Sequence, residues 1–258
     1  MREIFNFNNN WIFEKKEVCL PHNAVELPFN YFDEKIYQKE FIYIKKINSK
    51  PNWNGKEISL VFEGVMSNAK VYLNDKKIIT HTDGYTPFVA RLTDELQKGE
   101  NTLKVEIDGS ENPSIPPFGG RIDYLTFAGI YRDVYLRVTS PIFINNIKIE
   151  TLNILEEKKS IKVRVNLQNP KEFDFSGSLI AKLIDAEGKI LSNSKYKITG
   201  KEIFFEINNL KNINLWDIDN PSLYKLDITI ETPHGIDNIN ESFGFRSENF
   251  NKNGFMLN

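Results

Sequence analysis

The side chains best suited to bind metals or to act as nucleophiles are few in this chain and lie far apart. Cys19 is the only cysteine, and two residues separate it from His22, a spacing that could supply two ligands of a metal site. The other two histidines, His81 and His234, lie far away in the sequence without neighbouring ligands. We therefore expect no metal site from these residues and interpret Cys19 as a buried structural thiol.

Motifs for other common chemistries are missing from the sequence. It has no glycine-rich phosphate loop, no nucleotide-binding fingerprint and no set of serine, histidine and aspartate with supporting spacing. The 33 lysines and arginines nearly balance 35 aspartates and glutamates, and a net charge of −2 does not attract polyanions, so we expect no nucleic-acid partner. No stretch resembles a signal peptide or a membrane span, so we expect a cytoplasmic protein without a membrane partner.

Hydrophobic and polar residues alternate along much of the chain, which is typical of β-strands because successive side chains of a strand point to opposite faces. In residues 102–107, for example, Leu103, Val105 and Ile107 share one face. The same period recurs in residues 160–167 and 224–230, and no segment shows a sustained helical face. We therefore expect an all-β protein. Because they lie in or beside apolar strands, three tryptophans are predicted to pack in the core or at its rim: Trp11, Trp53 and Trp216.

The character of the sequence changes near Thr139-Ser140-Pro141, which indicates a domain boundary. The part before this point is rich in irregular loops with aromatic residues and prolines. The part after it shows a plainer alternation over roughly 100 residues, the size of an immunoglobulin-like sandwich. The predicted domains are residues 1–140 and 141–246, followed by a short segment, residues 247–258.

Several motifs in this order resemble glycoside hydrolase family 2. Residues 62–74, 84–88, 99–103 and 123–136 are similar to the N-terminal sugar-binding domain of the family. Residues 215–224 resemble its second domain, and residues 243–246 and 254–258 resemble the strand that leads from that domain into its catalytic barrel. The resemblance covers nearly the whole chain and is strongest to β-galactosidases, then to β-glucuronidases. It implies a galactose-binding-like jelly-roll sandwich followed by an immunoglobulin-like β-sandwich.

The resemblance places the catalytic residues outside this chain. Retaining glycosidases need two carboxyl groups about 5–5.5 Å apart, and the family carries both in the barrel that should follow residue 258. Asn240-Glu241 reproduces the dipeptide of the family's acid/base glutamate, but it directly precedes the strand Phe243–Arg246. We interpret Glu241 as a surface carboxylate. We therefore expect no catalytic residue in this chain and no hydrolysis by the chain alone.

Asp123 is the residue that the resemblance singles out for sugar binding. In several family members this aspartate reaches the mouth of the barrel and binds sugar hydroxyls, directly or, in some galactosidases, through a monovalent cation. A carboxylate can accept hydrogen bonds from two neighbouring hydroxyls, although Asp123 could instead stabilise the turn after residues 119–121. Asn30 and Asp33 are further candidates, with hydrogen bonds inside their own loop as the alternative. We expect no cofactor, apart from a monovalent or divalent cation near Asp123 in a full-length enzyme.

Three functions are consistent with these observations. The first is the non-catalytic front part of a β-glycosidase, which binds a β-galactoside or β-glucuronide together with the missing barrel. The alternatives are a stand-alone carbohydrate-binding module and a scaffold chain that complements a separate barrel. In the last case Phe255, Met256 and Leu257 would form half of an interface. Family members are often oligomers, so a homo-oligomer is a further open expectation.

Overall fold

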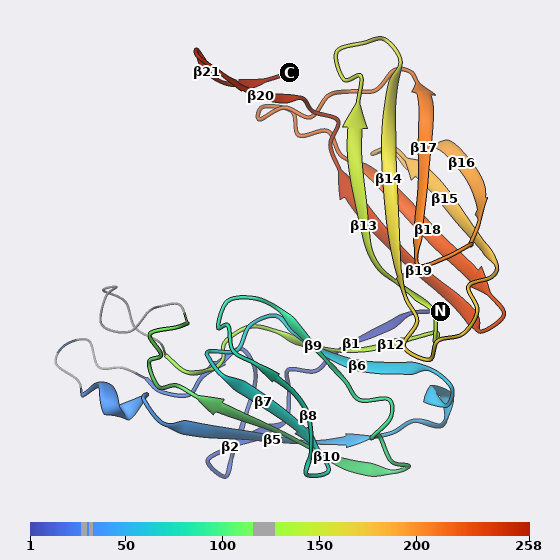
Figure 1. Cartoon of the computed structure of the whole chain (residues 1–258). Helices are drawn as coiled ribbons and strands as arrows, with labels where there is room; N and C mark the ends of the chain where they lie inside the picture. The colour runs from blue at the N-terminus through green and yellow to red at the C-terminus, as the bar shows by residue number, and fades with distance from the viewer. Residues whose placement is uncertain (27–29, 31–32, 116–126) are drawn as a thin grey trace. The chain divides into compact units, whose positions relative to one another are not determined.

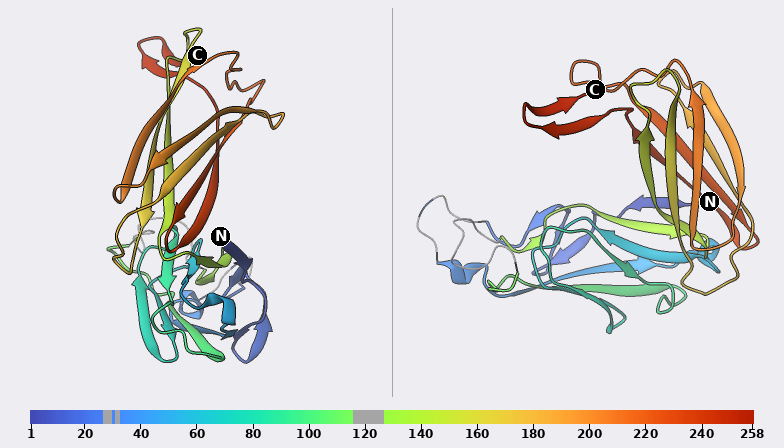
Figure 2. Two further views of the ribbon diagram at one scale, coloured as in Figure 1. Left: turned by 90° about the vertical axis from the view of Figure 1, so that its right-hand side faces the viewer. Right: turned by 45° about the horizontal axis from the view of Figure 1, so that its top comes forward.

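The computed structural model describes residues 1–26, 30, 33–115 and 127–258 and consists of β-strands with two short 3-10 helices (Figure 1). These helices are η1 (Glu34–Ile36) and η2 (Pro51–Trp53). The chain divides into two compact units, Glu3–Val138 and Thr139–Asn258, and the second unit also includes Met1–Arg2. Figure 2 shows the strands of each unit from two further directions. In the part of the chain that the structure describes, neither helix could cross a lipid bilayer.

The first unit contains a four-stranded sheet, a six-stranded sheet and a small strand pair. The four-stranded sheet has the order β1 (Glu3–Asn6), β12 (Val134–Thr139), β6 (Glu57–Phe62) and β9 (Phe88–Arg91). The six-stranded sheet has the order β3 (Lys16–Val18), β2 (Trp11–Phe13), β5 (Glu40–Asn48), β10 (Glu100–Asp108), β7 (Ala69–Leu73) and β8 (Lys76–His81). One hydrophobic core draws residues from both sheets, which is the arrangement of a sandwich.

Strand β10 shows how the alternation of the sequence builds this core. Leu103, Val105 and Ile107 are fully buried, as predicted. On the opposite face, Lys104 Nζ and Glu106 Oε1 form an ion pair at 2.9 Å. Trp11 and Trp53 are also buried in the first unit, which confirms the expectation for these two residues.

The second unit consists of a three-stranded sheet, a four-stranded sheet and a hairpin. The smaller sheet has the order β13 (Phe143–Leu152), β14 (Lys159–Gln168) and β17 (Glu202–Leu210). The larger sheet has the order β16 (Ile190–Lys197), β15 (Ser178–Ile184), β18 (Tyr224–Thr232) and β19 (Gly235–Phe243). The hairpin pairs β20 (Glu248–Asn251) with β21 (Gly254–Leu257). Alternate residues of both sheets meet in one core, so the expected immunoglobulin-like sandwich is confirmed.

A buried ion pair joins the first residues of the chain to the core of the second unit. Arg2 Nε and Nη2 donate to the two carboxylate oxygens of Asp237, at 3.1 and 2.8 Å. Asp237 also accepts a hydrogen bond from the backbone N of Ile144 at 2.8 Å, and Arg2 donates to the Ile144 carbonyl. The Asp237 side chain is fully buried and that of Arg2 is 12% exposed. The carboxylate therefore depends on Arg2 for its charge partner and for two of these three hydrogen bonds.

The expectation of a buried thiol at Cys19 is wrong. Cys19 is exposed, and its Sγ donates a hydrogen bond to Asn9 Oδ1 at 3.1 Å. It directly follows strand β3, where Val18 packs against the core, and Leu20 is buried on its other side. Because side chains alternate along an extended chain, burial of residues 18 and 20 turns residue 19 toward solvent.

Candidate functional site

The loops that carry the predicted sugar-binding residues begin at one small strand pair of the first unit. Strand β4 (His22–Asn23) pairs antiparallel with β11 (Gly129–Ile130), and the backbone N of Ala24 donates to the Ala128 carbonyl at 2.8 Å. The chain after β4 carries Asn30 and Asp33, and the chain before β11 carries Asp123. In an antiparallel pair the end of one strand lies beside the start of the other, so the two loops leave the same end of this pair.

Gly129 allows the close approach of β4 and β11. Its φ of +123° is a conformation that other residues rarely adopt, and a Cβ at this position would lie 2.5 Å from the carbonyl oxygen of His22 and 2.7 Å from the backbone N of Ala24. Any side chain at this position would push the strands apart. The pair thus fixes the starting points of both loops.

The structure places two of the three candidate residues. Asp123 lies outside the described residues, so its role in sugar binding stays a prediction. Asn30 is exposed. Asp33 is also exposed, and its Oδ1 accepts a hydrogen bond from the backbone N of Lys35 at 3.0 Å. This bond is the interaction within the loop that we gave as the alternative for Asp33, and sugar binding by Asn30 and Asp33 likewise stays a prediction.

Three aromatic side chains, Phe13, His22 and Tyr43, form a cluster at strand β4. His22 Nδ1 and the hydroxyl of Tyr43 lie 2.8 Å apart, and the ring of Phe13 lies 5.0 Å from that of His22 and 4.7 Å from that of Tyr43. Burial lowers the pKa of His22 and raises the pKa of Tyr43, because both charged forms lose hydration. Both side chains are therefore kept neutral near pH 7, which suits a supporting role rather than proton transfer. Sequence reasoning missed this cluster, because its members come from three strands.

The structure also offers no ready metal site in the residues that it describes. Within residues 1–26, 30, 33–115 and 127–258, no three histidine, cysteine, aspartate or glutamate side chains gather closely enough to hold an ion.

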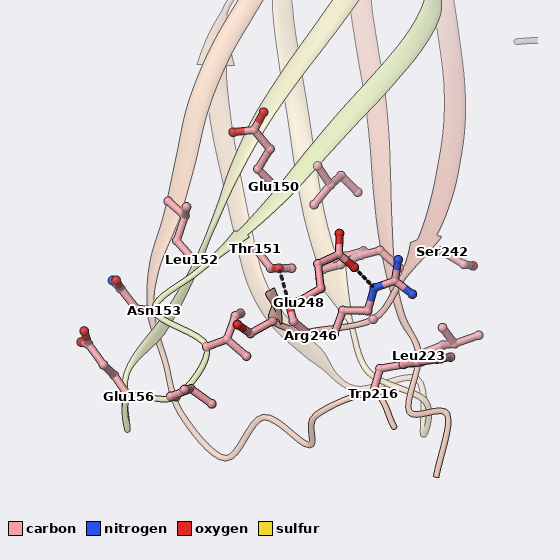
Figure 3. Close-up of a pocket in the computed structure, with 16 residues that line it drawn as sticks. Glu150, Thr151, Leu152, Asn153, Glu156, Trp216, Leu223, Ser242, Arg246 and Glu248 are labelled. Atoms are coloured by element: carbon pink, nitrogen blue, oxygen red, sulfur yellow. Dashed lines mark hydrogen bonds and ion pairs between the residues drawn. The ribbon is translucent and has the colours of Figure 1, made fainter. Parts of the chain in front are cut away.

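The second unit has a groove of about 930 Å³ beside the β20–β21 hairpin (Figure 3). Trp216 lies on one side of it, with its ring 5.2 Å from the guanidinium carbon of Arg246. Arg246 Nε pairs with Glu248 Oε2 at 3.3 Å, and the Arg246 carbonyl accepts a hydrogen bond from Thr151 Oγ1 at 3.2 Å. The groove is completed by the end of β13 and the turn that follows it, by Leu223 and by residues 242–244.

The hairpin is fastened to the wall of this groove and presents exposed apolar side chains. Asn258 Nδ2 donates to the Trp216 carbonyl at 2.9 Å, and its backbone N donates to the Ser247 carbonyl at 2.9 Å. Large apolar side chains are exposed on the hairpin and along the groove: Leu155, Leu223, Phe250, Phe255 and Met256. We call these five residues together with Trp216 the apolar rim. Exposed apolar surface of this kind is typical of sites that contact proteins, membranes or ligands.

The sequence predicted only part of the apolar rim. It pointed to Phe255, Met256 and Leu257 as apolar residues seeking a partner; the first two are exposed and Leu257 is partly buried. It gave no sign of Leu155 and Leu223, which lie in turns that are distant in sequence. Trp216 is partly buried and lines the groove, and its packing at the core stays a prediction.

Comparison with known proteins places both units in one family. Residues 22–114 match the family model described as the glycosyl hydrolase 2 galactose-binding domain-like, and residues 142–246 match the model of glycosyl hydrolases family 2. The chain carries the N-terminal domains of glycoside hydrolase family 2. The expected family and the two expected folds are thereby confirmed, and the catalytic region of the family is not among these 258 residues.

Relatives of these family 2 domains are considerably longer. The chain is 42% identical to a β-galactosidase of Rhizobium meliloti over 272 residues and 39% identical to a β-galactosidase of Thermoanaerobacterium thermosulfurigenes over 279 residues. Both matches cover the whole chain but only 36% and 39% of the relatives. The fold is also found in a β-glucuronidase of Bifidobacterium dentium, with a TM-score of 0.86, 19% identity and coverage of 99% of this chain and 50% of that one.

Proposed function

We propose that the chain is the sugar-facing and supporting part of a family 2 β-galactosidase, in which hydrolysis takes place in a catalytic region outside these residues. The observation that carries the proposal is the identity of 42% and 39% with two β-galactosidases over the whole chain. A β-glucuronidase of Bacteroides fragilis is only 28% identical over the same span. A β-galactoside is therefore the proposed substrate.

The first domain would contribute polar groups to the sugar site from the two loops that leave the β4–β11 pair. A carboxylate at position 123 and the amide of Asn30 offer the acceptors and donors that sugar hydroxyls need. Glu241 does not supply the missing acid, because it is exposed on β19, a strand at the edge of its sheet. Hydrolysis should thus require the carboxyl pair of a catalytic region.

The second domain would hold the catalytic region through the apolar rim. Phe250 lies in ring contact with Phe255, with centroids 5.0 Å apart, and in the part of the chain that the structure describes these residues are 79% and 53% exposed. Burial of such side chains against another domain would contribute about 1.5–3 kcal/mol each. The groove beside them would accept side chains of the same partner.

A chimera tests the proposal. The 258 residues would replace the corresponding part of the Rhizobium meliloti β-galactosidase, and hydrolysis of nitrophenyl β-galactoside would be measured for the chimera and for the chain alone. We expect hydrolysis by the chimera and none by the chain alone. In the chimera, Asp123→Ala should lower kcat/KM at least about tenfold, because charge-assisted hydrogen bonds to the sugar are lost. The exposed Asp174 of the second domain supplies the control variant Asp174→Ala.

Two outcomes would contradict this proposal. Turnover by the chain alone would show that it holds a catalytic pair. Micromolar, saturable binding of galactose by the chain alone, measured by titration calorimetry, would instead support a stand-alone carbohydrate-binding module.

A further inference from the structure

A small charged cavity lies on the face of the β13–β14–β17 sheet that is turned away from the core. It has a volume of about 200 Å³ and is lined by Lys148, Glu150, Lys162, Arg164 and Phe204. Strand register explains why these residues meet. Lys148 on β13 and Phe204 on β17 are both paired with Arg164 on β14, and the neighbouring pair is Glu150 with Lys162.

Positive charge prevails in this cavity. Three of its side chains are cationic and one is anionic, and Lys148 Nζ lies 2.8 Å from Glu150 Oε1. The pKa of the Glu150 carboxyl is lowered by the hydrogen bond and charge of Lys148, and further by the charges of Lys162 and Arg164. Glu202 and Glu206 flank Phe204 on the same exposed face of β17, so the excess of positive charge is confined to the residues that line the cavity.

Arg164 has an unused donor beside an exposed aromatic ring. Its Nε is buried and has no hydrogen-bond partner among the described residues. A buried donor without an acceptor is unfavourable, so an acceptor that draws the guanidinium outward would satisfy it. Phe204, the strand partner of Arg164 on β17, is 58% exposed and lines the same cavity, so its ring is open to a ligand there.

We propose that this cavity binds a sugar that bears a carboxylate, with the carboxylate on Arg164 and the apolar face of the sugar ring against Phe204. The planar guanidinium matches a carboxylate with two parallel hydrogen bonds, and Lys148 and Lys162 add attraction from the sides. The cavity is smaller than the 300–1,000 Å³ of sites that enclose a drug-sized ligand. It therefore takes one sugar unit, with most of the ring open to solvent. The site belongs to the second domain, whereas the loops of the proposed galactoside site belong to the first.

Titration of the ¹⁵N-labelled chain with galacturonate, followed by NMR, tests the proposal. We expect saturable shifts of backbone amides in β13, β14 and β17, with a Kd of about 1–10 mM for so open a site. Neutral galactose should leave these strands unchanged. Galactose 6-sulfate should bind more weakly than galacturonate, and tighter binding of the sulfate would contradict the carboxylate assignment. Shifts confined to the first domain would overturn this proposal and leave the galactoside proposal standing.

Variants separate recognition from general charge effects. Arg164→Ala should weaken galacturonate binding at least about fivefold. Phe204→Ala should weaken galacturonate but not acetate, which has no ring. Glu150→Gln should tighten binding about two- to threefold, because it removes a carboxylate that competes for the same cations. Lys197→Ala, on β16 of the other sheet, is the matched control and should change nothing. The proposal fails if Glu150→Gln weakens binding or if Arg164→Ala, still folded, binds as the unmodified chain does.

Discussion

Replacement of Arg2 by alanine should destabilise the second domain although residue 2 lies at the start of the chain. In the structure the fully buried carboxylate of Asp237 accepts two hydrogen bonds from Arg2 and one from the backbone of Ile144. Without Arg2 this carboxylate keeps only the backbone bond and loses its charge partner. Breaking a buried pair by removing one member costs about 3–5 kcal/mol.

The expected size of the effect is large for a domain of this length. The second unit has about 120 residues, for which 1 kcal/mol corresponds to a shift in Tm of roughly 3–6 °C, so Arg2→Ala should lower its Tm by about 10 °C or more. A combined Arg2→Met and Asp237→Leu variant should recover much of this loss, because it removes both charges from the interior. Lys46→Ala is the matched control, because Lys46 and its partner Glu100 are each 57% exposed and such pairs contribute 0–1 kcal/mol.

Hydrogen exchange followed by mass spectrometry can show which of the two domains loses stability in Arg2→Ala. Peptides from β13 and β19, which carry Ile144 and Asp237, should exchange faster in Arg2→Ala, whereas peptides from β10 in the first domain should keep their protection. If Arg2→Ala shifted Tm no more than Lys46→Ala does, the reasoning about the buried pair would be refuted.

Two further predictions concern a histidine and a glycine. Because burial lowers the pKa of His22 below its usual 6.5, the unfolded chain binds more protons, and stability of the first domain should fall as the pH drops from about 7 to about 5.5. His22→Asn should flatten this urea-denaturation profile, and a profile identical to that of the unmodified chain would contradict the assignment. Gly244→Ala should lower Tm and alter tryptophan fluorescence, because its Cβ would lie 2.5 Å from the Cβ of Trp216. Gly200→Ala, with open space around it, should leave both unchanged.

The strands were predictable because their signal is local. The alternation of apolar and polar residues depends only on the geometry of one strand. Leu103, Val105 and Ile107 are buried, which confirms the prediction that they share the core face. The error at Cys19 has the same origin. Its residue type favoured burial, but its place between two residues that face the core turned it outward.

Features that depend on distant segments were not predictable from one sequence. The apolar rim joins turns and a hairpin from separate parts of the chain, so only its C-terminal members could be anticipated. The Arg2–Asp237 pair joins residues 235 positions apart, and neither residue carries a local sign of its partner. The predicted sugar-binding role of Asp123 rests on family resemblance alone, because a carboxylate in a loop has no periodic pattern to reveal its function.

The position of Arg2 has a consequence for how the chain is made and handled. During synthesis Arg2 leaves the ribosome long before Asp237 exists, so this pair in the second domain can form only after Asp237 has been added. A purification tag fused directly before Met1 would therefore disturb the stability of the second domain rather than strand β1 beside it. Proteolytic removal of the first two residues would have the same effect.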